Sequence, residues 1–133
     1  MEIKTPPQQK HIAHLQKLLN NENKTSTVGI VDLKGDIDYW QVIALENGEA
    51  VGLATIQFGN ELYKLYVAPN YRNKNVADKL VNYVMGCLKN NGETEMFIEM
   101  TQKSLPFWGN FIKKNQLKYN VYEGQLKADI ILK

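Results

Sequence analysis

Three β-strand patterns in succession, joined by very short turns, restrict the fold of this chain more than any other feature. The runs "YWQVIAL", "AVGLATIQF" and "ELYKLYV" are rich in valine, isoleucine, tyrosine and other residues that pack well in strands. The turn residues between them, "NGE" and "GN", are typical of tight hairpins. The pattern predicts three consecutive antiparallel strands within residues 39–67.

Helical patterns flank these strands. Apolar residues recur at helical spacing in residues 8–20 and every fourth residue from Asn75 to Asn91, where Gly92 supplies a stop signal. The other expected elements are a short strand in "TVGIVDL", a strand in "EMFIEM", a helix in "SLPFWGNFIKKN" and a final strand pair in "KYNVYEGQLKADIIL". The predicted fold class is α/β, with a mixed, mostly antiparallel sheet flanked by helices.

Composition restricts both size and partners. The 133 residues, 44% of them hydrophobic, predict a single domain over 1–133. The net charge of +2 makes nucleic acid an unlikely partner, and no run of about 18 apolar residues indicates a membrane span. The lone cysteine, Cys87, excludes an internal disulfide and favours a cytoplasmic protein, and no cluster of cysteine and histidine predicts a metal site. The protein is expected to be a monomer or a homodimer.

A short polar loop, "YRNKN", lies between the third strand and the long helix. The first amides of a helix have no partner within the helix, so they attract anions such as phosphate, and Arg72 and Lys74 add positive charge. A plainer interpretation is that Asn75 caps the helix and that Asp78 completes a capping pair. Local sequence alone favours the plainer one.

The wider string "LYVAPNYRNKNVADKLVNYVM" resembles the acyl-CoA-binding motif of the GNAT-type N-acetyltransferase superfamily. In that family an apolar strand ending in V-x-P-x-Y-R leads into a loop of pattern R/Q-x-x-G-x-G/A and a long helix, and Arg72 and Ala77 match the two ends of the loop pattern. The strands before the motif and "EMFIEM" after it extend the resemblance to about two-thirds of the chain.

The resemblance implies a GNAT-like fold that uses acetyl-CoA as acyl donor and an amine of a small molecule or peptide as acceptor. Backbone amides of the loop would hold the pyrophosphate, and the third strand would pair with the pantetheine arm. The cofactor-binding residues implied in this way are Leu65, Tyr66, Val67, Arg72, Asn73, Lys74, Asn75, Val76 and Ala77.

Two positions depart from the family pattern. Asn75 replaces a glycine that is favoured where the backbone needs a positive φ, although asparagine tolerates that conformation better than most residues. Aligned without gaps, Ile112 replaces the tyrosine that usually protonates the departing CoA thiolate. A register that uses Phe107 and Trp108 supplies no tyrosine either.

Acetyl transfer from CoA is a direct attack of an amine on a thioester, which requires positioning and a base. The candidate general bases are Glu61, at the start of the third strand, and Glu99, in "EMFIEM"; both have the alternative of a solvated carboxylate. The function predicted is transfer of an acetyl or other acyl group to a primary amine. The alternatives are a catalytically silent binding module for acyl-CoA or a protein, and a small interaction protein with a basic stripe.

Overall fold

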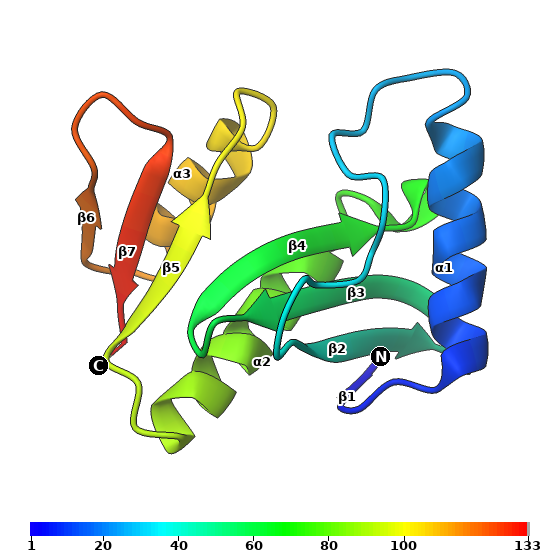
Figure 1. Cartoon of the computed structure of the whole chain (residues 1–133), viewed down its shortest axis with the longest axis horizontal. Coiled ribbons are helices and arrows are strands. Elements are labelled where there is room, and N and C mark those ends of the chain that lie inside the picture. The colour runs from blue at the N-terminus through cyan, green and yellow to red at the C-terminus, as the bar shows by residue number, and fades with distance from the viewer. Residues whose placement is uncertain (133) are drawn as a thin grey trace.

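A computed structural model describes residues 1–132 as one seven-stranded sheet with three α-helices (Figure 1). The strand order is β1-β2-β3-β4-β5-β7-β6, and only the β4–β5 pair is parallel. The strands are β1 (Glu2–Lys4), β2 (Trp40–Glu46), β3 (Glu49–Gln57), β4 (Glu61–Val67), β5 (Glu95–Glu99), β6 (Tyr119–Val121) and β7 (Lys127–Ile131). The helices are α1 (Gln9–Glu22), the 3-10 turn η1 (Pro69–Tyr71), α2 (Val76–Asn90) and α3 (Leu105–Lys114).

The helices cover opposite faces of the sheet, as Figure 1 shows with α1 on one side and α2 and α3 on the other. Side chains alternate along a strand, so β2 turns Val42 and Ala44 toward the core under α2 and α3, and Ile43 and Leu45 toward the core under α1. A strand that is buried on both faces has a nearly continuous run of apolar residues in its sequence. Such runs made β2 and β3 predictable from the sequence.

Most of the predicted elements are confirmed: the three antiparallel strands, the long helix α2, and α3 with Pro106 in its first turn. The strand predicted in "TVGIVDL" is wrong, because residues 27–33 form an irregular loop. Side chains form hydrogen bonds with the backbone of that loop. The Gln16 amide donates to the carbonyl of Val31 and accepts from the N–H of Leu33. Gln41 and Thr55 both donate to the carbonyl of Leu33. The short strand β1, which pairs with β2, was not predicted.

Strands β4 and β5 separate soon after they begin. Their parallel pairing is limited to Glu61 with Phe97 and Leu62 with Ile98. The register between β3 and β4 also shifts here, because Thr55 pairs with Lys64 and Ile56 with Leu62, which leaves Tyr63 as an extra bulged residue. Figure 1 shows the two strands diverging beyond this point, so the edge of β4 is open over its second half.

Residues 1–132 contain neither a membrane-spanning helix nor a cluster of metal-ligating side chains. No helix there is long and apolar enough to cross a membrane. Over the same residues, no group of three or more histidine, cysteine, aspartate or glutamate side chains is arranged to hold a metal ion.

Candidate active site

A cleft of about 1230 Å³ occupies the space where β4 and β5 diverge. Its walls come from the second half of β4, the segment 26–30 after α1, the start of α2, the end of β5 and one side of α3. Residues distant in the sequence therefore meet around one opening. All nine residues expected to bind acyl-CoA lie at or beside this cleft, and eight of them line it; Lys74 is the exception.

The edge of β4 that faces the cleft carries backbone groups that are not paired with a neighbouring strand. The amide N–H of Ala68 donates to the carbonyl of Val51 on β3 at 2.9 Å. Successive residues of an antiparallel strand direct their backbone N–H and C=O groups to opposite sides. The backbone groups of Leu65 and Val67 therefore point away from β3, toward the cleft. The backbone of Tyr66 faces β3 instead. Arg72 Nε already donates to the Val67 carbonyl, so an extended ligand arm could pair with both backbone groups of Leu65 and with the N–H of Val67, as an added strand does.

The loop from Asn73 to the first turn of α2 presents a row of amides. Asn73 and Asn75 both adopt left-handed backbone conformations, with φ of 62° and 65°. Within residues 1–132, the N–H groups of residues 73–78, including those of Val76 and Ala77, have no hydrogen-bond acceptor. Unpaired amides at a helix start fit the pyrophosphate of CoA.

The interpretation of Asn75 as a side-chain cap is wrong. Its side chain makes no capping hydrogen bond, and Asp78 forms an ion pair with Lys114 of α3 instead of closing a capping pair. Asparagine at this position instead supplies the positive φ that the family's glycine would supply.

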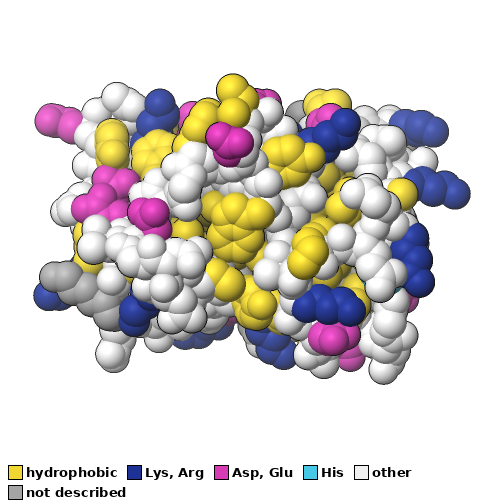
Figure 2. Space-filling view, turned by 60° about the horizontal axis from the view of Figure 1, so that its bottom comes forward, with side chains coloured by type: hydrophobic (Ala, Val, Ile, Leu, Met, Phe, Trp, Pro, Cys, Tyr) yellow, Lys and Arg dark blue, Asp and Glu magenta, His cyan; other side chains and the backbone are white. Residues whose placement is uncertain are grey.

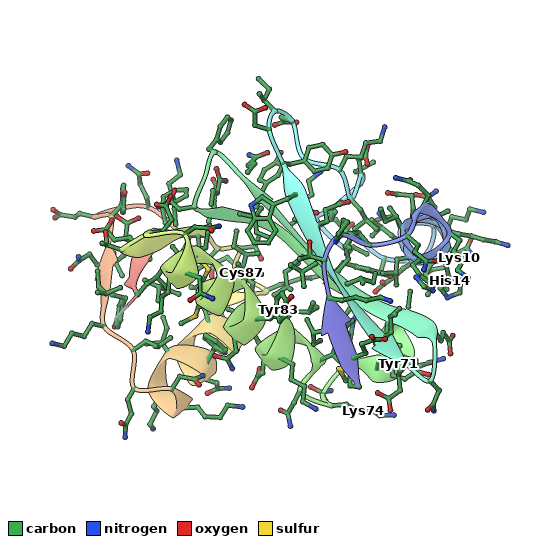
Figure 3. All side chains as sticks on the ribbon, turned by 90° about the horizontal axis from the view of Figure 1, so that it is seen from below. Lys10, His14, Tyr71, Lys74, Tyr83 and Cys87 are labelled. Carbon is green, nitrogen blue, oxygen red and sulfur yellow. The ribbon has the colours of Figure 1, made fainter. Side chains whose placement is uncertain are left out.

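The two basic residues of the loop are held in place by other groups. The Arg72 guanidinium makes a bidentate ion pair with Glu22 at the end of α1, with N–O distances of 2.6 and 2.8 Å. The Lys74 ammonium lies 5.5 Å from the centre of the Tyr71 ring, and Figure 3 shows the two residues together in the segment before α2. Glu22 thus offsets the charge of Arg72, so the groups of this loop that remain to attract an anion are its backbone amides and the Lys74 ammonium.

The two candidate bases differ in position. Glu99 lines the cleft from the end of β5, whereas Glu61 lies just beside it, next to the lining residue Leu62. Burial raises the pKa of Glu61; a hydrogen bond from Gln57 opposes the rise, and the negative charges of Glu99 and Asp36 add to it. A raised pKa brings a carboxylate closer to what a general base needs at neutral pH.

Helix α3 supplies no tyrosine to the cleft. Trp108 and Phe111 are buried in the core, and Ile112 packs against it. Of the tyrosines that line the cleft, Tyr66 already donates its hydroxyl to Glu22 at 2.8 Å. Cys87 lies on α2 (Figure 3), where burial raises the pKa of its thiol and so disfavours the reactive thiolate.

Sequence reasoning missed two residues that shape the cleft. Glu22, the last residue of α1, binds Arg72 and Tyr66. Lys103, in the segment between β5 and α3, donates to the carbonyl of Thr27 at 2.8 Å and so joins the two walls of the cleft. All three contacts link residues at least 44 positions apart, and no short motif signals such pairs.

A basic stripe for nucleic acid is not visible on the face of the molecule in Figure 2. Acidic and basic side chains are interspersed there, with hydrophobic side chains between them near the middle. A nucleic-acid-binding surface is expected to gather lysine and arginine on one face. This face therefore does not favour the reading as a basic interaction protein.

Comparison with known proteins identifies the class. Residues 22–111 match the family described as the acetyltransferase (GNAT) domain. The chain belongs to this family. No curated protein matches the sequence.

Solved structures share the fold at low sequence identity. Tetrahymena GCN5 superposes with a TM-score of 0.68 at 14% identity, covering 99% of this chain and 95% of that one. YncA from Salmonella typhimurium, solved with its cofactor acetyl-CoA, superposes with a TM-score of 0.67 at 16% identity, covering 98% of this chain and 91% of that one. The PaiA N-acetyltransferase from Thermoplasma acidophilum, in complex with coenzyme A, superposes with a TM-score of 0.66 at 17% identity, covering 98% of this chain and 97% of that one. These likenesses establish the GNAT fold.

Proposed function

We propose that this protein transfers an acetyl or other acyl group from CoA to a primary amine. The observation that carries the proposal is the continuity of two features: the open edge of β4 leads directly into the loop of unpaired amides. The edge suits the amide-containing pantetheine arm, and the loop suits the pyrophosphate. Membership of the GNAT family and the neighbours solved with CoA or acetyl-CoA support the same donor.

The reaction needs no covalent intermediate with the protein. The amine nitrogen attacks the thioester carbonyl carbon, a C–N bond forms, and the C–S bond breaks as the CoA thiolate leaves. The proton lost by the nitrogen goes to a carboxylate, for which Glu99 and Glu61 are the candidates, directly or through water. The thiolate leaves without a dedicated acid, because a thiol pKa near 8.5 makes it a fairly stable anion, which solvent then protonates.

The decisive test combines binding with turnover. Calorimetry of the purified protein with acetyl-CoA should show one site per chain, and a panel of primary amines should release free CoA thiol with at least one acceptor. If acetyl-CoA does not bind, the proposal fails.

A catalytically silent binding module is the second candidate, and the lack of an α3 tyrosine favours it. Binding of acetyl-CoA without thiol release for any amine in the panel would support that candidate over the enzyme.

A further inference from the structure

The Glu22 carboxylate joins three elements of the fold at one wall of the cleft. It is the last residue of α1, it accepts the Tyr66 hydroxyl of β4 at 2.8 Å, and it binds both terminal nitrogens of Arg72. The Glu22 side chain is only 17% exposed. Bidentate, charge-assisted hydrogen bonds of this kind fix orientation as well as supply energy.

Arg72, whose orientation Glu22 fixes, also contacts the proposed CoA site. Its Nε donates to the Val67 carbonyl at 3.0 Å, and its guanidinium lies 5.6 Å from the centre of the Tyr66 ring. Val67 is the last residue of the open edge, and Arg72 immediately precedes the amide loop. One side chain therefore links the end of the edge to the beginning of the loop, while Glu22 fixes it to α1.

We propose that Glu22 and Arg72 are a positioning pair that sets the spacing between the β4 edge and the amide loop. The inference rests on the proposed function, since it concerns how one CoA molecule spans both parts of the site. The arm and the pyrophosphate are covalently joined, so binding of one favours binding of the other only if the two subsites are held at the matching distance. A prearranged spacing also lowers the ordering cost of binding.

This role differs from direct phosphate binding by Arg72. A phosphate ligand would have to compete with Glu22 for the guanidinium fork, whereas a positioning pair stays intact when CoA binds. A positioning role makes a specific demand: breaking the pair should weaken CoA more than it weakens the separate halves of CoA.

The experiment compares three ligands on the whole protein: CoA, pantetheine and ADP, with NMR titration for the two weak fragments. The main variant is Glu22→Gln, which keeps the shape of the side chain and removes its charge. We expect it to weaken CoA binding by about tenfold or more, because the linkage between subsites is lost, and to change each fragment by less than about threefold.

Two further variants keep the test decisive. Glu46→Gln is the matched control, because Glu46 pairs with the chain's amino terminus away from the cleft, and it should leave all three affinities unchanged. If Glu22→Gln does not fold, Arg72→Lys keeps the positive charge but loses the fork and the Nε bond to Val67, and the same pattern is expected from it.

The remaining outcomes overturn either the positioning pair alone or the proposed function as well. Unchanged CoA affinity in folded Glu22→Gln refutes the positioning pair and leaves the proposed function intact. An equal loss for CoA and both fragments would mean general loosening of the site, which also refutes it. A wild-type protein that does not bind CoA removes the proposed function and this inference with it.

Discussion

At the scale of single residues, the backbone of Asn75 is decisive for the amide loop. Its φ of 65° is a conformation that costs most residues roughly 1–2 kcal/mol and costs glycine almost nothing. Because the side chain makes no capping bond, Asn75→Gly should leave the free energy of unfolding within about 1 kcal/mol of wild type, while Asn75→Ala should lose about 1 kcal/mol. Urea unfolding measures both.

CoA titration of the same two variants tests the site. Asn75→Gly should bind CoA as tightly as wild type or more tightly, because the N–H groups remain in place and the side chain is gone. Weaker binding by the glycine variant at unchanged stability would show that the asparagine side chain itself contacts the ligand.

The candidate bases make a second prediction at this scale. With an active acceptor, the rate should fall as pH falls through the raised pKa of Glu61 if that residue is the base, because a protonated carboxyl cannot accept a proton. Replacing the true base by glutamine, in Glu61→Gln or Glu99→Gln, should lower the rate at neutral pH by about a hundredfold. It should also move the profile to higher pH, where more of the amine is already deprotonated.

Glu95→Gln is the control for the bases, since Glu95 begins the same strand as Glu99 but does not line the cleft. Wild-type rates and pH profiles in both base variants would assign proton removal to solvent or to the substrate.

At the scale of elements, the position of α2 depends on Gly52 of β3. A Cβ atom there would lie 3.0 Å from side-chain atoms of Val76 and Leu80 and 3.3 Å from the Tyr66 carbonyl oxygen. Val76 is the first residue of α2, so the added methyl of Gly52→Ala presses on the helix start that carries the amide loop. We expect it to cost about 1–3 kcal/mol of stability and to weaken CoA binding.

Gly86→Ala is the matched control for that helix. Gly86 lies inside α2, and a Cβ added there meets no atom within 4 Å. The substitution should stabilise the protein by up to about 1 kcal/mol through helix propensity and leave CoA affinity unchanged. If Gly52→Ala behaves in the same way, contact with β3 does not set the position of the loop.

At the scale of the whole molecule, the cleft divides the sheet into two parts. Within residues 1–132, strands β1 to β4 and strands β5 to β7 pair at two positions, Glu61 with Phe97 and Leu62 with Ile98, and they share a core. A ligand that binds the folded protein but not the unfolded chain raises the free energy of unfolding by about 2.7 kcal/mol when its concentration is a hundred times its Kd. At that concentration, acetyl-CoA should therefore raise the Tm by about 5–10 °C.

Thermal unfolding with adenosine at the same concentration is the control, because adenosine has neither pyrophosphate nor arm. No shift with saturating acetyl-CoA would contradict a CoA site in the cleft.

The sequence by itself determined the elements whose signals are local. Apolar periodicity and hairpin turns predicted β2, β3, β4 and α2, because these patterns reflect burial on sheet and helix faces. The family motif located the loop, whereas the left-handed backbone of Asn75, with φ of 65°, was shown by the structure.

Only the tertiary structure decided the orientation of Arg72, the irregular path of residues 27–33 and the bridge from Lys103 to Thr27. In each case the partner lies far along the chain: Glu22 is 50 positions from Arg72, and Thr27 is 76 positions from Lys103. The residues that satisfy the loop backbone, such as Gln41 and Thr55, likewise come from other elements. A side chain's partner depends on which groups the fold brings within hydrogen-bond distance. Packing of the whole chain, and not the adjacent residues in the sequence, determines which groups come that close.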